Sequence, residues 1–80
     1  MKAQIYDEIK TLVALNLNYQ TIIPQGTLGA IVECYHNHEG YAVDLAIHDE
    51  KMITGFSYYH SILTPEQFTV IIPAKVQKTL

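Results

Sequence analysis

Large apolar and polar residues alternate along most of the chain, which is the pattern of β-strands with one buried face. Residues 41–47 show this alternation most regularly, and they predict an inward row of Tyr41, Val43, Leu45 and Ile47. The residues between them are then expected on the outward face, namely Ala42, Asp44 and Ala46. The polar residues on either side, 36–40 and 48–51, predict a tight hairpin before this strand and a turn after it.

A second strand is predicted over residues 27–35, where both faces carry apolar side chains. One face is expected to hold Leu28, Ala30, Val32 and Cys34. The other face is expected to hold Ile31, Glu33 and Tyr35. Such a strand suits a bent strand shared by the two halves of a small barrel. Gly29 then marks a bend or a close approach of two backbones.

Two further strands are predicted nearer the C-terminus. Residues 52–59 form the first, which can run on toward Leu63, and residues 69–72 form a short last strand that ends at Pro73. Between them, Thr64 followed by Pro65 is a helix-start signal and predicts a single helical turn.

The first part of the chain is ambiguous. Residues 5–15 fit both a helical stripe and a strand, and we expect a strand at 10–15 with a short helical turn ahead of it. Residues 16–26 predict a long loop because Pro24 blocks a central strand. Residues 73–80 predict a frayed or helical tail.

These elements predict an all-β fold, namely a small five-stranded SH3-like barrel with a long first loop and one helical turn before the last strand. Eighty residues, of which 49% are hydrophobic and 16% charged, allow one domain over residues 1–80 with its core at about 5–72. No apolar run is long enough to span a membrane. The start of the chain does not have the pattern of a secretory signal, and the single cysteine forms no internal disulfide. We therefore expect a cytoplasmic protein.

The charge of the chain points away from nucleic acid and toward a basic protein. The formal net charge is −3, and all the basic residues are scattered lysines, Lys2, Lys10, Lys51, Lys75 and Lys78. Nucleic acids and anionic membrane surfaces are bound through clustered Lys and Arg, so neither is an expected partner. An acidic rim that favours a basic partner is predicted from Glu33, Asp44, Asp49 and Glu50.

Three segments, residues 24–35, 40–45 and 63–68, carry a family pattern. The matching residues, with two from the start of the first strand, are Tyr6, Asp7, Gly26, Gly29, Glu33, Tyr35, Tyr41, Val43, Pro65, Gln67 and Phe68. They resemble a bacterial family of short SH3-like barrel proteins, a domain-of-unknown-function family with the pattern Gly-x-x-Gly-x-Val-Val-Glu-x-Tyr and later Leu-x-Pro-x-Gln-Leu. The chain departs from the pattern between Asp7 and Gly26, which is a few residues longer, and between Lys51 and Leu63. The resemblance implies a stand-alone barrel without established chemistry that acts as an antitoxin-, immunity- or accessory-type partner.

Tyrosines are the most informative candidates for a binding surface. Tyr19 lies in the long loop, Tyr35 ends a predicted strand, and Tyr58 and Tyr59 must point to opposite sides of theirs. Tyrosine supplies rigid amphipathic contact area. With Glu33 and Asp44 these four tyrosines form the predicted interaction surface, although each could instead be an ordinary half-buried side chain.

The sequence gives little evidence for a catalytic or metal-binding site. His36 and His38, with His48, are the candidates for a metal site, but the residues fit a polar hairpin tip equally well and no ligand-spacing motif accompanies them. Cys34 is expected to be a small hydrophobe on the inward face. No nucleophile motif surrounds either serine in residues 57–61. We expect no enzyme activity and no cofactor.

Two hypotheses of function follow. The first is a non-enzymatic module that binds a protein partner through its exposed tyrosines. A domain of this size is also a candidate for self-association. The second is a small-ligand or metal-binding barrel that uses the hairpin histidines. An auxiliary subunit of a larger complex rests on analogy of fold alone.

Overall fold

The computed structural model describes residues 1–18 and 20–77, and strands dominate it. The strands are β1 (Glu8–Thr11), β2 (Leu15–Asn16), β3 (Ile22–Ile23), β4 (Leu28–Tyr35), β5 (Gly40–His48), β6 (Phe56–Leu63) and β7 (Phe68–Ile72). The two helical elements are short, a 3-10 turn η1 (Pro65–Gln67) and a helix α1 (Ala74–Gln77). The prediction of a mostly β protein is therefore confirmed.

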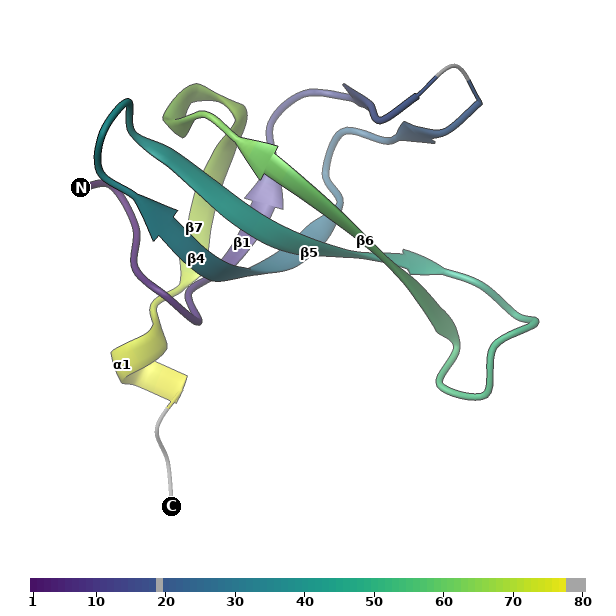
Figure 1. The fold of residues 1–80 in the computed structure, drawn as a ribbon. Coiled ribbons are helices and arrows are strands. Elements are labelled where there is room, and N and C mark those ends of the chain that lie inside the picture. The colour runs from purple at the N-terminus through teal and green to yellow at the C-terminus, as the bar shows by residue number, and fades with distance from the viewer. Residues whose placement is uncertain (19, 78–80) are drawn as a thin grey trace.

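Five strands form one antiparallel sheet in the order β6-β5-β4-β1-β7, and β2 pairs with β3 in a separate two-stranded sheet. Figure 1 shows the β2–β3 hairpin projecting from the main sheet at the side opposite to α1. Among the described residues no ladder joins the edge strands β6 and β7. The closure of the sheet into a barrel thus stays a prediction.

The inner face of the sheet carries the core. The predicted inward row of β5 is confirmed, because Tyr41, Val43 and Leu45 are fully buried and Ile47 packs against them. The other large side chains that are fully buried come from β1, β3, β4, β6 and β7, and they are Ile9, Ile23, Ile31, Leu63 and Phe68. Of the pair Tyr58 and Tyr59, the second packs against this core and the first is exposed, as their alternation predicts.

The predicted faces of β4 are wrong in the first half of the strand. Gly29 and Ile31 are buried there, whereas Leu28 is exposed. The register with β5 shifts between Ile31 and Glu33, and after that irregularity Cys34 packs against the core. An extra residue in one strand reverses the alternation from that point on. One uninterrupted alternation of inward and outward side chains along residues 27–35 therefore cannot describe both halves of the strand.

Three predicted boundaries are corrected. β6 begins at Phe56 and not at residue 52, because residues 50–55 form a turn in which Gly55 has a φ of +87°. The predicted strand at 10–15 ends at Thr11, since the chain bends at residues 12–13. The long loop at 16–26 contains part of the β2–β3 hairpin, whose Ile23 is buried.

The remaining local predictions agree with the structure, with one exception. Thr64 precedes η1, and its N–H donates to Gln67 Oε1 at 2.9 Å. β7 ends before Pro73, and the tail is helical up to residue 77, while residues 78–80 lie outside the described residues. In place of the helical turn expected before the first strand there is a turn at residues 5–6, where Tyr6 has a φ of +73°.

A buried threonine joins the two ends of the segment between β1 and β4, residues 12–27, which we call the excursion. The Thr11 hydroxyl donates to the carbonyl oxygen of Pro24 at 3.2 Å and accepts from the N–H of Thr27 at 3.0 Å. The Thr11 backbone also pairs with Thr27 O and with the Gly26 N–H. Thr27 in turn donates its hydroxyl to Pro24 O at 2.7 Å. The two ends of the excursion are thereby joined through both the side chain and the backbone of Thr11.

We expect Thr11→Val to lower the free energy of unfolding by about 1–3 kcal/mol, because it leaves the buried Thr27 N–H without its acceptor. Urea unfolding monitored by circular dichroism measures the loss. Thr69→Val is the matched control, since Thr69 is half-buried on β7 and its hydroxyl makes no hydrogen bond among the described residues. Equal stability of the Thr11→Val variant and the wild type would show that the hydrogen bonds of the Thr11 hydroxyl contribute nothing to stability.

The N-terminal segment is held against the core by a buried tyrosine. The Tyr41 ring packs edge-on to Phe68 at 5.2 Å between centroids, and the Lys2 ammonium lies 4.7 Å from the centre of the Phe68 ring. The Tyr41 hydroxyl accepts from the N–H groups of Lys2 and Ala3 and donates to Glu39 Oε2. Burial, and then the bond to Glu39, raise the pKa of Tyr41, whereas the same bond lowers the pKa of Glu39.

The raised pKa of Tyr41 predicts an alkaline loss of stability. Because the fold favours the neutral phenol, its contribution is complete below the unfolded pKa of about 10 and is lost as pH rises through the folded value. We expect the free energy of unfolding to fall as pH rises above about 10, and to fall less in Tyr41→Phe. Burial also raises the pKa of the Cys34 thiol, so both proteins are compared in a Cys34→Ala background. Identical pH profiles of the two would contradict the prediction.

Candidate interaction surface

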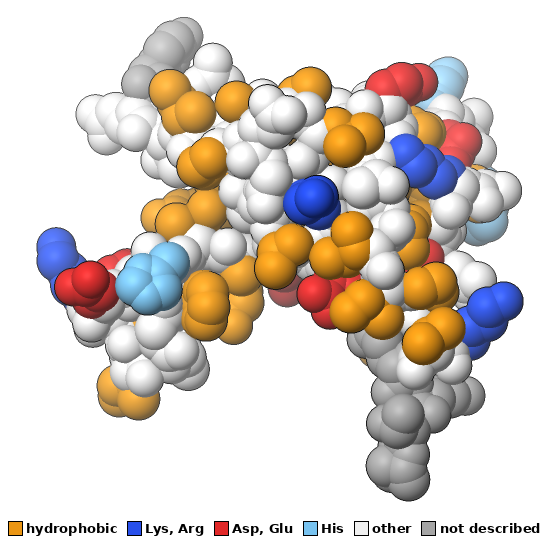
Figure 2. All heavy atoms as spheres, turned by 180° about the vertical axis from the view of Figure 1, so that it is seen from behind, with side chains coloured by type: hydrophobic (Ala, Val, Ile, Leu, Met, Phe, Trp, Pro, Cys, Tyr) orange, Lys and Arg blue, Asp and Glu red, His pale blue; other side chains and the backbone are white. Residues whose placement is uncertain are grey.

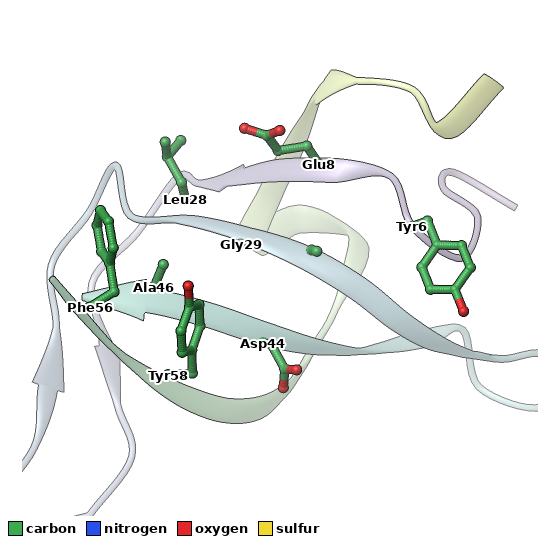
Figure 3. Close-up of a pocket in the computed structure, with 9 residues that line it drawn as sticks. Tyr6, Glu8, Leu28, Gly29, Asp44, Ala46, Phe56 and Tyr58 are labelled. Atoms are coloured by element: carbon green, nitrogen blue, oxygen red, sulfur yellow. The ribbon is translucent and has the colours of Figure 1, made fainter. Parts of the chain in front are cut away.

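The outer face of the five-stranded sheet is hollowed into a groove of about 510 Å³. Its lining comes from the turn before β1 and from β1, β4, β5 and β6, and consists of Tyr6, Glu8, Leu28, Gly29, Ala30, Asp44, Ala46, Phe56 and Tyr58. We call this set of residues the outer groove. In Figure 3, Leu28, Phe56 and Tyr58 lie at one end of the outer groove and Tyr6 lies at the other.

The pairing register of the sheet explains how these distant residues meet. Glu8 of β1 pairs with Ala30 of β4, and Ala30 pairs with Asp44 of β5. These three residues form one row across the sheet. Leu28, Ala46 and Tyr58 form a neighbouring row in the same way. Because residues two apart on a strand share a face, both rows point away from the core.

Small residues make the floor of the outer groove. The floor contains Ala30 and Ala46, whose methyl groups leave the space above β4 and β5 open. A Cβ on Gly29 would lie 2.6 Å from the carbonyl oxygen of Asp44, so only glycine allows the two strands to approach this closely. The predicted close backbone approach at Gly29 is confirmed.

The walls are apolar and remain exposed to solvent. The exposed fractions are 70% for Tyr6, 62% for Tyr58, 45% for Leu28 and 39% for Phe56. Figure 2, which views the molecule from behind Figure 1, shows that hydrophobic side chains are also exposed elsewhere on this face of the molecule, with acidic side chains among them. Exposed apolar patches of this kind are typical of interaction sites.

The polar groups of the outer groove are two carboxylates. The Asp44 Oδ1 atom lies 2.9 Å from His60 Nδ1, in a pair that is well exposed on both sides. Glu8 extends from β1 on the other side of β4. Within the described part of the chain, neither carboxylate forms an ion pair with a lysine. Glu8 and Asp44 therefore give the outer groove a negative charge.

The structure brings together only part of the predicted interaction surface. Tyr58 and Asp44 line the outer groove, whereas Tyr59 turns to the core. Glu33 and Tyr35 lie at the other end of β4, both exposed. The prediction for Tyr19 falls outside the described residues.

Most of the residues that line the outer groove were not among the predicted surface residues, and three of them, Phe56, Glu8 and Tyr6, show why. Phe56 shares a face with Tyr58, and this spacing of two could have identified it. Glu8 and Tyr6 carry no such signal, because their place in the groove depends on the pairing of β1 with β4 and on the turn before β1.

The hairpin histidines are not placed together with His48. His36 and His38 lie in the turn between β4 and β5, whereas His48 ends β5. This nine-residue strand separates them by roughly 26 Å at 3.3 Å per residue. Residues 1–18 and 20–77 contain no group of three or more His, Cys, Asp or Glu side chains that could hold a metal ion.

A second hollow, of about 680 Å³, lies against the N-terminal segment and contains Glu33, Cys34 and His36. Burial, then the charges of Asp7 and Glu33, raise the pKa of the Cys34 thiol above its ordinary value of 9.0. The thiol is therefore protonated at neutral pH. A protonated thiol is a poor nucleophile and a poor metal ligand.

No family model, curated protein or solved structure matches the chain. The resemblance to the family of short SH3-like proteins therefore stays a prediction. In the part of the chain that the structure describes, no helix has the length and apolar character needed to cross a membrane.

We expect Gly29→Ala to lower the free energy of unfolding by about 1–3 kcal/mol, because the nearest atom to the added methyl group is a backbone oxygen of β5, which cannot rotate away as a side chain can. Gly40→Ala is the control, since a Cβ there would meet its nearest neighbour at an ordinary 3.6 Å. Thermal unfolding of both variants checks the difference. A loss in Gly40→Ala as large as that in Gly29→Ala would refute the close-approach argument.

Proposed function

We propose that this protein is a non-enzymatic interaction module that binds a protein partner in the outer groove. The observation that carries the proposal is the exposure of Tyr6, Leu28, Phe56 and Tyr58 around one hollow. Fully burying an apolar side chain of this size is worth about 1.5–3 kcal/mol. A partner that covers several of them gains enough to offset the entropy lost on association.

The openness of the groove favours a macromolecule over a small ligand. Small-molecule sites bury about 70–90% of their ligand, usually in an enclosed cavity. Here the four walls keep more than a third of their surface in contact with water. A second protein surface can cover these four side chains together, whereas a small molecule would leave much of their surface exposed to solvent.

The proposal extends to the fold and to the kind of partner. The strand order β6-β5-β4-β1-β7, the excursion between β1 and β4, and the 3-10 turn before β7 support an SH3-like barrel as the underlying architecture. The net charge of −3 and the carboxylates of the outer groove support a basic partner. An antitoxin-, immunity- or accessory-type role would use such a surface.

Differential capture tests the proposal. The immobilised full chain is exposed to lysate of the source cells, and the bound proteins are compared between wild type, Tyr58→Ser and Tyr35→Ser. Both substitutions replace an exposed tyrosine with a small polar residue, but only Tyr58 lines the outer groove. We expect a stoichiometric partner that Tyr35→Ser retains and that Tyr58→Ser binds about tenfold more weakly or not at all.

Two results would contradict the proposal. One is a wild-type protein that retains no stoichiometric partner. The other is a partner that Tyr58→Ser retains as well as the wild type does. Circular dichroism of the variants separates loss of binding from loss of fold, and the exposure of both tyrosines predicts that the fold is kept.

A further inference from the structure

We infer that the outer groove recognises a basic residue in an extended segment of its partner, with the cationic group seated above Ala30 between Glu8 and Asp44. An apolar side chain two residues away in that segment would then fill the end formed by Leu28, Phe56 and Tyr58. The inference deepens the proposed function and rests on it, because it names the chemistry of the ligand that the same groove takes.

The spacing of the two carboxylates carries the first step. Glu8, Ala30 and Asp44 pair across three adjacent strands. Neighbouring strands lie about 4.8 Å apart, so the Cα atoms of the two acidic residues are about 10 Å apart. Figure 3 shows their side chains on opposite sides of β4. A guanidinium or ammonium group above the Ala30 methyl can therefore reach a carboxylate on each side.

The charges already present leave room for such a cation. Asp44 uses Oδ1 for His60, at the outer end of the same row, and this leaves its second oxygen available. Lys10 lies on β1 two residues beyond Glu8, paired with Leu28, and among the described residues it makes no ion pair with either carboxylate. A metal ion fits less well. Among the described residues, no third His, Cys, Asp or Glu side chain joins the two carboxylates in a group that could hold one.

The aromatic and apolar walls carry the second step. Tyr6 stands at one end of the groove, and Phe56 and Tyr58 stand at the other with Leu28. Aromatic faces attract cations within about 6 Å, and the apolar end excludes water from the stem of a long basic side chain. Arginine suits both features, because its planar group stacks on rings and bonds two carboxylates at once.

The geometry also sets the spacing of the ligand. The row of Ala30 and the row of Leu28 are two residues apart on β4. Side chains two apart in an extended peptide point the same way, at the same distance of about 7 Å. A basic residue over the first row therefore places the residue two positions away over the second row.

A peptide titration tests the inference on the full chain. The probe is the capped peptide acetyl-Ile-Ser-Arg-Ser-Ile-amide, which presents isoleucine two positions from arginine in either direction. Its partner probe carries citrulline, the neutral isostere, in place of arginine. Binding is followed through the backbone amide signals of the protein in two-dimensional NMR. We expect the arginine peptide to bind about fivefold or more tightly than the citrulline peptide, with shifts centred on Gly29, Ala30 and Ala46.

Variants separate the cationic contact from the apolar one. In the double variant Glu8→Gln with Asp44→Asn, the preference for arginine should fall to about one while the citrulline peptide binds as before. Tyr58→Ser should weaken both peptides. Glu50→Gln is the charge control, since Glu50 is an exposed acid in the β5–β6 turn and does not line the groove, and it should keep the preference for arginine.

Equal binding of the two peptides, or a preference that survives the double variant, would overturn the inference while leaving the proposed function to the capture experiment. Failure of both peptides to bind would overturn it as well. Sedimentation equilibrium then identifies one cause: a wild-type dimer that becomes a monomer in Tyr58→Ser would assign the groove to a second copy of this chain. A preference for arginine lost only in the double variant supports the inference.

Discussion

The close packing of β4 against β5 is the contact on which the rest of the molecule depends. Gly29 permits it, because any side chain there would meet the backbone of Asp44. On the inner side this approach brings Leu45 into the core beside Ile9 and Ile31. On the outer side the same strand pair places Ala30, a small residue of the groove floor, between Glu8 and Asp44. Core and groove are thus two faces of one strand pair.

Because the core is small, hydrogen bonds from buried polar side chains also hold the surrounding chain segments in place. Thr11 ties the two ends of the β1–β4 excursion together, and the Tyr41 hydroxyl holds the N-terminal backbone. Asp7, also buried, accepts the N–H of Gln4 with one oxygen and the N–H of Ala74 with the other, which joins the first turn to α1. Each bond satisfies a backbone group that burial would otherwise leave costly.

The small size of the chain also explains why the outer face of the sheet stays exposed. A sheet of this size cannot cover both of its faces, and the helical elements in residues 1–18 and 20–77 are a single 3-10 turn and one short helix. The apolar residues of the outer groove therefore stay in contact with water, at a free-energy cost that the proposed partner would relieve. In the proposed complex, Glu8 and Asp44 would add specificity, because carboxylates favour a cationic segment and disfavour an acidic one.

Local chemistry in the sequence was sufficient for β5, η1, the end of β7 and the opposite orientations of Tyr58 and Tyr59, because each depends on neighbours a few residues away. The faces of β4 could not be predicted, since the irregularity between Ile31 and Glu33 appears only when the strand is paired. The outer groove likewise depends on register: Glu8, Asp44 and Tyr58 are far apart along the chain and meet only across four hydrogen-bonded strands. Alternation reveals which residues share a face of a strand, but only the tertiary structure decides which strands lie beside one another.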